Sequence, residues 1–308
     1  MARIVFMGTP DFAVPVLLRM IDDGYEIIVV TQPDRPAGRG RTIEMPPVKR
    51  AALEHGLAVL QPESVNTPDV TARLREWSPE AGIVAAFGQL LGSEILDLPT
   101  HGHLNVHASL LPRWRGASPI VAAILAGDEE TGVTIMLIDA GLDTGPMLAK
   151  ARCAITAEDT TGSLEPRLAQ LGANLLSQTL PRWLRGEIIA EPQDATRATF
   201  AGHVEKNDGR VDWAQPADLL WRMSRAYEPW PGLFAFAGEQ RVRLWRMLPL
   251  QGWRGDELPG EVVESYDEML VVATGEGALI LEEVQLAGKK RTSGIDFRRG
   301  QRNLRFFS

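Results

Sequence analysis

The sequence predicts an α/β protein with a first domain built on a doubly wound parallel sheet and a smaller second domain built as a β-barrel. Three observations support this fold class. From residue 3 to residue 126, short apolar runs alternate with amphipathic segments. Two further apolar runs flank a glycine-rich turn between residues 134 and 155, and short β-rich runs follow one another beyond residue 207. Strands separated by helices pair in parallel, whereas closely spaced short strands form barrels or sandwiches.

Buried parallel strands are apolar on both faces, and the segment 27–30, Ile-Ile-Val-Val, has this pattern. The first helix is expected where Val16, Leu17 and Met20 share one face before Gly24. The same criteria predict strands at 3–7, 26–31, 58–60, 82–87 and 103–107, and helices at 46–55, 70–77 and 120–125. This βαβα order is typical of a Rossmann-like sheet.

The end of the first domain is predicted by a strand pair and a long helix. Strands are expected at 134–138 and 147–155, on either side of the glycine-rich turn. Leucines from residue 164 onward share one helical face up to about Leu184, and Gly186 follows. We therefore assign residues 1–189 to the first domain and the polar, weakly periodic segment 190–206 to a linker.

The second domain, residues 207–308, is predicted to be a small barrel of the OB-like type. Its β-rich runs are separated by turn residues such as Gly238 and Pro259-Gly260. Strands are expected at 233–236, 242–245, 261–263, 270–273 and 278–284. Short strands at this spacing are typical of a small barrel.

Composition restricts the class of protein and its partners. Hydrophobic residues make up 44% of the 308 residues and charged residues 23%, which excludes disordered, collagen-like and coiled-coil chains. The net charge of −8 argues against a polyanionic partner for the chain as a whole. The last 22 residues nevertheless contain seven lysines and arginines and one aspartate, a local charge of +6. This basic end is either solvated surface or a local anion-binding site.

The sequence also predicts where the protein acts. No apolar run reaches the roughly 20 residues needed to cross a bilayer, and Pro10 and Asp11 interrupt the first apolar stretch, unlike a signal peptide. Cys153 is the single cysteine, and no Cys or His cluster has zinc-ligand spacing. We therefore expect a cytoplasmic protein without a metal ion or membrane contact, with Cys153 as a core residue.

Candidate catalytic residues lie on one expected strand and in one turn. Asn105 and His107 are two residues apart on a strand, so their side chains share a face near its carboxyl end, where open α/β sheets bind ligands. Asp143 lies in the glycine-rich turn, where the backbone can approach a ligand closely. Asn105 and His107 could also be hydrogen-bonded core residues, and Asp143 could simply form an Asx-turn.

The turn after the first strand, residues 8–12, excludes two classes of nucleotide-binding protein. It has one glycine, Gly8, and Pro10 lacks the amide N–H that a phosphate loop uses. We therefore reject an NAD-binding fingerprint and a P-loop. The next expected loop, residues 32–41, carries Arg35, Arg39 and Arg41. It is either suited to contact with phosphate or an ordinary solvated loop.

Together these segments resemble the 10-formyltetrahydrofolate-dependent formyltransferases. Residues 105–117, Asn-Val-His-Ala-Ser-Leu-Leu-Pro-Arg-Trp-Arg-Gly-Ala, resemble the signature of that family, and Asp143-Thr144-Gly145 matches the aspartate that completes its site. Ala108 stands where the family often has glycine. The resemblance covers nearly the whole chain. Five flanking segments resemble the methionyl-tRNA formyltransferase branch: 9–12, 32–41, 195–200, 230–231 and 287–290.

The resemblance implies transfer of a formyl group from 10-formyltetrahydrofolate, as co-substrate, to the amino group of methionyl-initiator tRNA, giving N-formylmethionyl-tRNA for translation initiation. Asn105 would donate a hydrogen bond to the formyl oxygen, and His107 would stabilise the oxyanion. Asp143 would orient His107 and help to take the amine proton, so that oxyanion donors and a base are both present. The folate would lie along the backbone of Ser109, Leu110, Leu111 and Pro112, with its pterin near residues 87–90 and 138–143.

The resemblance also implies how the tRNA is bound. Arg39 and Arg41 would lie against the acceptor stem, and Phe12 would form a wall of the methionine pocket. Contacts to tRNA phosphates would come from Lys206, Lys289 and Lys290. The chain is expected to act as a monomer.

Three alternatives remain open. A formyltransferase of the same superfamily could act on a small substrate, such as glycinamide ribonucleotide or an amino-sugar nucleotide, although the basic loop at 32–41 favours tRNA. A non-catalytic RNA-binding protein could keep the fold without turnover. A folate-dependent hydrolase could use the same three side chains on water and release formate.

Overall fold

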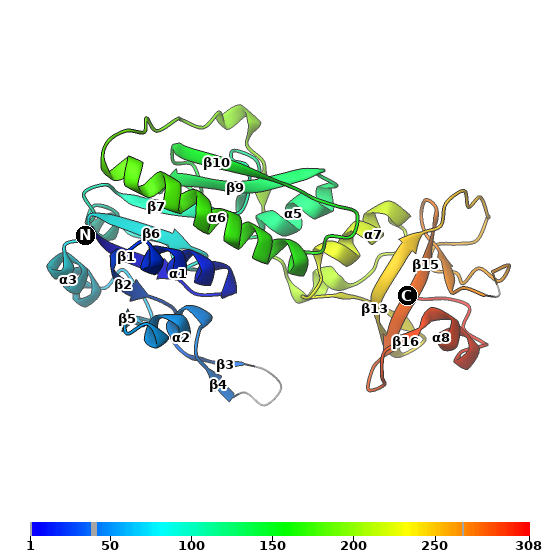
Figure 1. Cartoon of the computed structure of the whole chain (residues 1–308). Coiled ribbons are helices and arrows are strands. Elements are labelled where there is room, and N and C mark those ends of the chain that lie inside the picture. The colour runs from blue at the N-terminus through cyan, green and yellow to red at the C-terminus, as the bar shows by residue number, and fades with distance from the viewer. Residues whose placement is uncertain (1, 38–41, 267) are drawn as a thin grey trace. The chain divides into compact units, whose positions relative to one another are not determined.

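The computed structural model describes residues 2–37, 42–266 and 268–308. The chain forms two compact units (Figure 1), which are described separately. The first unit comprises Met1–Pro119, Glu130–Ala154 and Leu164–Ala201, and the second comprises Ile120–Glu129, Ile155–Ser163 and Gly202–Ser308. The predicted boundaries divide the chain into consecutive segments: a first domain of residues 1–189, a linker of residues 190–206 and a second domain of residues 207–308. This division stays a prediction.

The first unit is built around a seven-stranded sheet with the order β10–β9–β7–β6–β1–β2–β5. The central strand β1 pairs in parallel with β2 and β6, and β5 and β7 extend the parallel part on either side. β9 and β10 add an antiparallel edge, as the strand pair around the glycine-rich turn predicts. The strands are β1 (Arg3–Gly8), β2 (Glu26–Val30), β5 (Ala58–Leu60), β6 (Ala81–Ala85), β7 (His103–His107), β9 (Glu130–Leu137) and β10 (Met147–Ala154).

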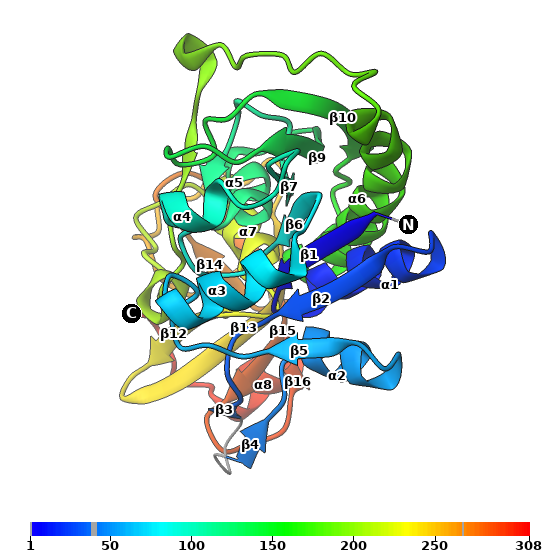
Figure 2. The same cartoon turned by 90° about the vertical axis from the view of Figure 1, so that its left-hand side faces the viewer.

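Helices cover both faces of this sheet, which confirms the doubly wound class (Figure 2). On one face, α6 lies close to the strands because Gly172 has no side chain, and a Cβ atom there would be 2.6 Å from Cγ1 of Val106. On the other face, Val70, Leu74 and Ile95 pack against strand residues such as Val5. The first face carries α1 (Val14–Asp22), α2 (Pro47–Glu54) and α6 (Thr161–Leu184), and the second carries α3 (Pro68–Trp77) and α4 (Ser93–Leu96).

The strand order reverses at β1, because β2 and β5 follow on one side and β6 and β7 on the other. Loops that leave the carboxyl ends of strands at such a point diverge and leave a crevice between them. Here three of the loops are tied together at their base. Thr9 Oγ1 and Gln32 Nε2 both donate to the carbonyl oxygen of Phe87, at 3.1 and 3.2 Å. These hydrogen bonds fix the three loops relative to one another where they leave the strands.

The segment 32–41, predicted to be a loop, is partly a hairpin. β3 (Arg35–Ala37) pairs antiparallel with β4 (Thr42–Glu44). β3 was not predicted because it contains Pro36. Proline cannot donate a hydrogen bond to a neighbouring strand and is confined to sheet edges. Arg39 and Arg41, the residues assigned to the acceptor stem, lie outside the described residues.

The base of this hairpin is braced by polar side chains. Lys49 Nζ lies 2.9 and 2.6 Å from the carboxylate oxygens of Asp34. Gln61 Nε2 donates to Asp34 Oδ1 at 2.7 Å and to the carbonyl oxygen of Gln32 at 2.9 Å. The hydrogen bond from Gln61, and then the bond from Lys49, lower the pKa of Asp34. The charged carboxylate thus fixes where the hairpin leaves the sheet.

The second unit is an antiparallel sheet of order β12–β13–β15–β14, with β16 paired to β15. Two short segments close it into a barrel. Val262 bridges to Val272 of β14, Glu261 bridges to Phe306, and Phe307 bridges to Ala237 of β12. This path joins the two ends of the strand order, so the predicted small barrel is confirmed. The strands are β12 (Leu233–Ala237), β13 (Gln240–Pro249), β14 (Val271–Ala273), β15 (Ala278–Leu286) and β16 (Thr292–Ser293).

Several short elements complete the chain. The sequence predicted α5 (Pro119–Ala126) but not α7 (Ala217–Ala226) or α8 (Gly294–Gly300). The remaining elements are β8 (Arg115–Gly116), β11 (Phe200–Ala201), and the 3₁₀ turns at Asp11–Ala13, Ala195–Arg197 and Lys206–Gly209.

None of the helices that the structure describes is both long and apolar enough to cross a membrane.

Candidate active site

Asn105 and His107 alternate along β7 with the buried apolar residues Leu104 and Val106. Both polar side chains reach the same carboxylate. Asn105 Nδ2 lies 3.4 Å from Asp143 Oδ1, and His107 Nδ1 lies 3.7 Å from Asp143 Oδ2. The structure therefore brings together the three residues that the sequence selected from two separate segments.

Asp143 reaches this position through an uncommon backbone conformation. It lies in the loop between β9 and β10 with φ of +50°, in the left-handed region that non-glycine residues seldom adopt. The loop also folds back closely on β9, because a Cβ atom on Gly145 would be 1.9 Å from the carbonyl oxygen of Leu137. The amide of Gly116 donates to Asp143 Oδ2 at 2.8 Å. The backbone conformation of Asp143 and the hydrogen bond from the Gly116 amide together direct the carboxylate toward β7.

The His107 ring is oriented on both of its nitrogen atoms. Nε2 lies 2.9 Å from the carbonyl oxygen of Trp114, and Nδ1 faces the Asp143 carboxylate. Both neighbours are acceptors, so an imidazolium, with two N–H donors, satisfies both of them. The His107 side chain is 6% exposed and that of Asp143 17% exposed. His107 is therefore buried, whereas the Asp143 carboxylate is partly exposed to solvent.

Residues 109–112, assigned to the folate, form a tightly bonded loop directly after β7. Thr134 Oγ1 donates to the carbonyl oxygen of Ser109 at 2.7 Å and accepts from the amide of Leu111 at 3.1 Å. Lys150 Nζ donates to the carbonyl oxygen of Leu111 at 2.6 Å. Ser109 Oγ donates to the carbonyl oxygen of Arg113 at 2.6 Å. The loop is thus a preformed backbone surface beside His107.

Four residues that support the site were not predicted. Gly116 and Gln193 contact Asp143 directly, while Thr134 and Lys150 hold the loop after β7. Gln193 lies in the polar segment assigned as a linker, where no periodicity marks it. Gly116 belongs to the quoted signature and could have been singled out there, because its φ of +115° requires glycine.

A cavity of about 630 Å³ opens among the loops after β1, β2 and β6. Its lining combines loop backbone with apolar side chains, among them Met45, Pro46 and Phe87. Phe12, assigned to the methionine pocket, does not line it; this side chain is buried in the 3₁₀ turn after β1. Phe12 could therefore shape the cavity only through the residues that cover it.

The lysines assigned to tRNA are exposed on the second unit. Lys206 begins a 3₁₀ turn, and Lys289 and Lys290 lie in the turn between β15 and β16. This turn is fixed by Gln285, whose Nε2 donates to the carbonyl oxygen of Lys289 at 2.9 Å. Gln285 in turn accepts from Trp245 Nε1 at 3.0 Å.

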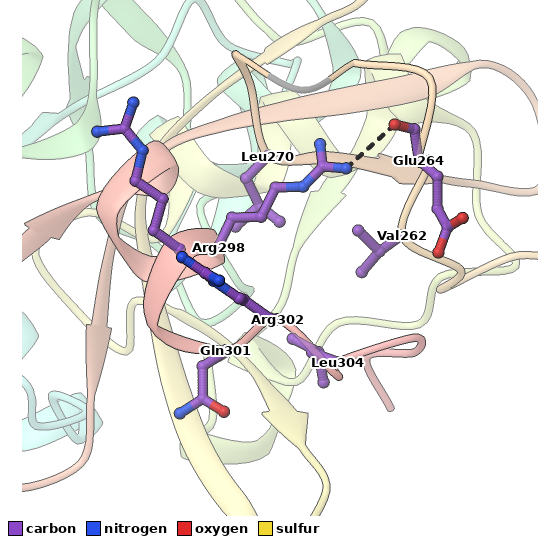
Figure 3. Close-up of a pocket in the computed structure, with 8 residues that line it drawn as sticks. Val262, Glu264, Leu270, Arg298, Gln301, Arg302 and Leu304 are labelled. Atoms are coloured by element: carbon purple, nitrogen blue, oxygen red, sulfur yellow. Dashed lines mark hydrogen bonds between the residues drawn. The ribbon is translucent and has the colours of Figure 1, made fainter.

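A second basic feature of this unit is a cavity of about 200 Å³ beside α8 (Figure 3). Arg298, Arg299 and Arg302 line it. The Arg298 guanidinium donates to the carbonyl oxygens of Glu264, Tyr266 and Met269, so it is a structural cation. Arg302 is exposed, and its positive charge adds to those of Arg298 and Arg299 beside the cavity.

Cys153 is not the core residue that the sequence predicted. It is partly exposed on β10, and its Sγ accepts a hydrogen bond from Arg167 at 3.3 Å. Cys153 lies on the less exposed side of β10, but β10 is the edge strand of the sheet and covers its residues only partly toward this end. Within residues 2–37, 42–266 and 268–308, no three His, Cys, Asp or Glu side chains gather as ligands for a metal ion.

Two family profiles match most of the chain. The formyl transferase profile matches residues 2–180, and the profile of the formyl transferase C-terminal domain matches residues 203–302. The chain is 46% identical to the methionyl-tRNA formyltransferase of Myxococcus xanthus, over 97% of this chain and 95% of that protein. It is 47% identical to the methionyl-tRNA formyltransferase of Bacillus licheniformis, with the same coverage of both chains.

Solved structures share the fold at low sequence identity. An N-formyltransferase from Helicobacter canadensis, in complex with folinic acid and dTDP-3-aminofucose, has a TM-score of 0.67 at 16% identity, covering 91% of this chain and 99% of that chain. HypX from Aquifex aeolicus, in complex with tetrahydrofolic acid, has a TM-score of 0.63 at 18% identity; the match covers 97% of this chain but only 47% of HypX. The two profile matches and the identity over nearly full length show that the chain belongs to the formyl transferase family, with the methionyl-tRNA formyltransferases as its full-length relatives.

Proposed function

We propose that the protein transfers the formyl group of 10-formyltetrahydrofolate to the amino group of methionyl-initiator tRNA, giving N-formylmethionyl-tRNA for translation initiation. One observation carries the proposal: the Asp143 carboxylate lies between Asn105 and His107 at 3.4 and 3.7 Å, beside a preformed backbone loop. This arrangement offers hydrogen-bond donors for a developing oxyanion together with a base. The methionyl-tRNA formyltransferases that resemble this chain over nearly its full length supply the choice of acceptor.

Asn105 and His107 are proposed to bind the formyl oxygen. An amide N–H from Asn105 and an N–H from His107 would both be donors where negative charge develops, and each such donor contributes roughly 10²–10³ in rate. Both side chains leave the same face of β7, so one oxygen atom can be reached by both. The Trp114 carbonyl oxygen would keep the second ring nitrogen in place.

Asp143 is proposed to accept the proton that the amine must lose. The neutral amine attacks the formyl carbon, a C–N bond forms, and the carbonyl electron pair moves onto the oxygen. When this pair returns, the bond between the formyl carbon and the folate nitrogen breaks, and that nitrogen takes up a proton. Asp143 would move the proton from the entering to the leaving nitrogen, a general acid–base contribution of roughly 10²–10⁴ in rate.

The folate is proposed to lie along residues 109–112, whose backbone is fixed by Thr134 and Lys150. The neighbouring loops offer apolar surface for the planar pterin. Leu90 is 84% exposed on the loop after β6, and Leu142 is 56% exposed on the loop that holds Asp143. A heteroaromatic ring system binds best where such apolar groups accompany a few fixed polar groups.

The aminoacyl end of the tRNA is proposed to enter the cavity after β1, β2 and β6, where Met45 and the prolines of its lining suit an unbranched thioether side chain. We propose that Phe12 supports this pocket, that Arg39 and Arg41 contact the acceptor stem, and that Lys206, Lys289 and Lys290 contact phosphates. These cations would provide the salt-dependent part of the affinity. We further propose a cytoplasmic monomer.

The proposal is tested by offering several acceptors to one preparation of the protein with 10-formyltetrahydrofolate. The panel contains methionyl-initiator tRNA, methionyl-elongator tRNA, a dTDP-amino sugar, glycinamide ribonucleotide and no acceptor. We expect formyl transfer to the initiator tRNA with a kcat/KM at least about tenfold above that for every other acceptor. Preferred transfer to the sugar or ribonucleotide, or formate release that does not depend on an acceptor, would replace the proposal by one of the alternative activities. Tight tRNA binding without transfer would indicate a non-catalytic RNA-binding protein.

A further inference from the structure

Gln193 connects a buried arginine to the backbone of Asp143. Its Nε2 donates to the carbonyl oxygens of Asp143 and Gly145, at 2.8 and 2.7 Å. Its Oε1 accepts from Nε and a terminal nitrogen of Arg115, at 3.1 and 2.9 Å. A carboxamide has two N–H donors and two lone pairs on its oxygen. All four are used here, so the orientation of the Gln193 amide is fixed.

Arg115 is a firm anchor for this connection. The residue is only 5% exposed, and β8, which consists of Arg115 and Gly116, pairs in parallel with β11. The amide of Arg115 also donates to the carbonyl oxygen of Thr199 at 2.9 Å. The next amide, that of Gly116, donates to the Asp143 carboxylate. Two adjacent residues therefore fix Asp143 from two sides: one contacts its carboxylate directly, and the other supports its backbone through Gln193.

Asp143 depends on such support for two geometric reasons. Its backbone has φ of +50°, a conformation that a non-glycine residue leaves readily unless neighbours stabilise it. Its carboxylate lies 3.4 and 3.7 Å from the Asn105 and His107 nitrogens, at or beyond the outer limit of a hydrogen bond. A small outward movement of the loop therefore removes these interactions altogether.

We propose that Gln193 and Arg115 are positioning residues for formyl transfer, which hold the Asp143 loop so that its carboxylate faces Asn105 and His107. The proposal rests on the proposed function, because it assumes that Asp143 takes part in transfer. Gln193 contacts the backbone of Asp143, and Arg115 contacts Gln193. Neither side chain is assigned a contact with the reacting atoms, so both act on the rate through Asp143. They are expected to contribute to kcat and not to the binding of either substrate.

The test uses the full chain with two substitutions of Gln193. Gln193→Leu removes all four hydrogen bonds and leaves the buried Arg115 unpaired, so it also lowers stability. Gln193→Glu keeps an acceptor for Arg115, so the buried arginine stays paired, but its carboxylate cannot donate to the carbonyl oxygens of Asp143 and Gly145. We expect Gln193→Glu to lower kcat by about 10- to 100-fold, with KM for tRNA and for folate changed less than about twofold.

A double-mutant cycle separates positioning from a general structural effect. In an Asp143→Asn background, Gln193→Glu should lower the residual single-turnover rate by less than about twofold, because the group that it positions is already inactive. Gln170→Glu, on the exposed face of α6, is the matched control and should leave kcat unchanged.

Equal fold losses in the two backgrounds, or a Gln193→Glu enzyme with the wild-type kcat, would overturn the positioning role. A reduced number of active sites with unchanged kcat per site would overturn it as well. Absence of N-formylmethionyl-tRNA with the wild-type chain would contradict the proposed function instead.

Discussion

His107 Nδ1 lies 3.7 Å from the Oδ2 atom of Asp143, although His107 is on β7 and Asp143 is in the loop between β9 and β10. The carboxylate is the common neighbour of His107 and Asn105. Because the opposite ring nitrogen faces the Trp114 carbonyl oxygen, the imidazole cannot rotate without losing one of its acceptors. A fixed ring of this kind can serve as an oxyanion donor without reorganisation during the reaction.

Replacement of His107 tests the oxyanion role. We expect His107→Ala to lower kcat by about 10² or more while the affinity for tRNA stays within about twofold, because the lost interaction forms only in the transition state. Single-turnover rates and tRNA binding are measured on the same preparation. His203→Ala removes an exposed histidine and should behave as wild type. A His107→Ala enzyme with near-normal turnover would remove His107 from the mechanism.

Gly116→Ala tests the backbone geometry beside Asp143. Gly116 has φ of +115°, and a Cβ atom there would lie 2.4 Å from the carbonyl oxygen of Ala201. We expect the substitution to lower the free energy of unfolding by about 1–3 kcal/mol and to reduce kcat, because the Gly116 amide moves away from the carboxylate. Urea unfolding and turnover check both effects. Gly202→Ala, where no atom lies within 4 Å of the added Cβ, is the control; equal stability of the two variants would contradict the assignment.

Removal of Lys289 and Lys290 tests tRNA binding by the second unit. If both lysines contact phosphates, the double alanine variant should weaken tRNA binding and reduce the slope of log K against log salt by about 0.7–0.9 for each lost contact. Titrations at several salt concentrations measure the slope. Arg73→Ala combined with Arg75→Ala removes two exposed cations from α3 and should leave the slope unchanged. An unchanged slope in the lysine variant would mean that these lysines only face solvent.

His103 should make stability depend on pH. Burial lowers the pKa of His103 to about 4 from 6.5, although a hydrogen bond with the Ile95 carbonyl group opposes this shift. The folded pKa is below the unfolded one, so the unfolded chain takes up the proton first as the pH falls. The stabilisation is therefore complete above about pH 6.5 and is lost progressively down to about pH 4.

The wild type should lose about 2 kcal/mol of stability from this residue between pH 7 and pH 5. His103→Gln should lack that part of the dependence, since glutamine does not titrate. Urea unfolding at the two pH values measures the difference. The same pH dependence in both proteins would show that another group is responsible.

Most of the fold could be predicted because it follows from local patterns. The apolar runs at residues 27–30 and 82–85 can be stable only inside a sheet covered on both faces, and the structure places them in β2 and β6. The closure of the barrel was beyond prediction in detail. The segment 261–263 was expected as a strand, but closure also needs the single bridge of Phe307 to Ala237, and the sequence gives no strand signal at residue 307.

The site was predictable for a different reason. Asn105 and His107 share a strand face by period-two geometry, and the resemblance to the formyltransferases identified Asp143 in its turn. Gln193 was missed because its contacts reach across 50 residues of sequence to Asp143 and 78 to Arg115. A polar residue in a segment without periodicity gives no local signal of such contacts, and only the folded chain shows them.

The most direct test of the assigned activity is the initial rate of formyl transfer from 10-formyltetrahydrofolate to methionyl-initiator tRNA, measured with the purified full-length protein in a buffer that contains a metal chelator. We expect catalytic amounts of protein to give N-formylmethionyl-tRNA in many turnovers, with the formyl group on the α-amino nitrogen. No product above the uncatalysed rate, with intact folate and an acceptor that another formyltransferase can use, would contradict the assignment of Asn105, His107 and Asp143 to formyl transfer onto tRNA.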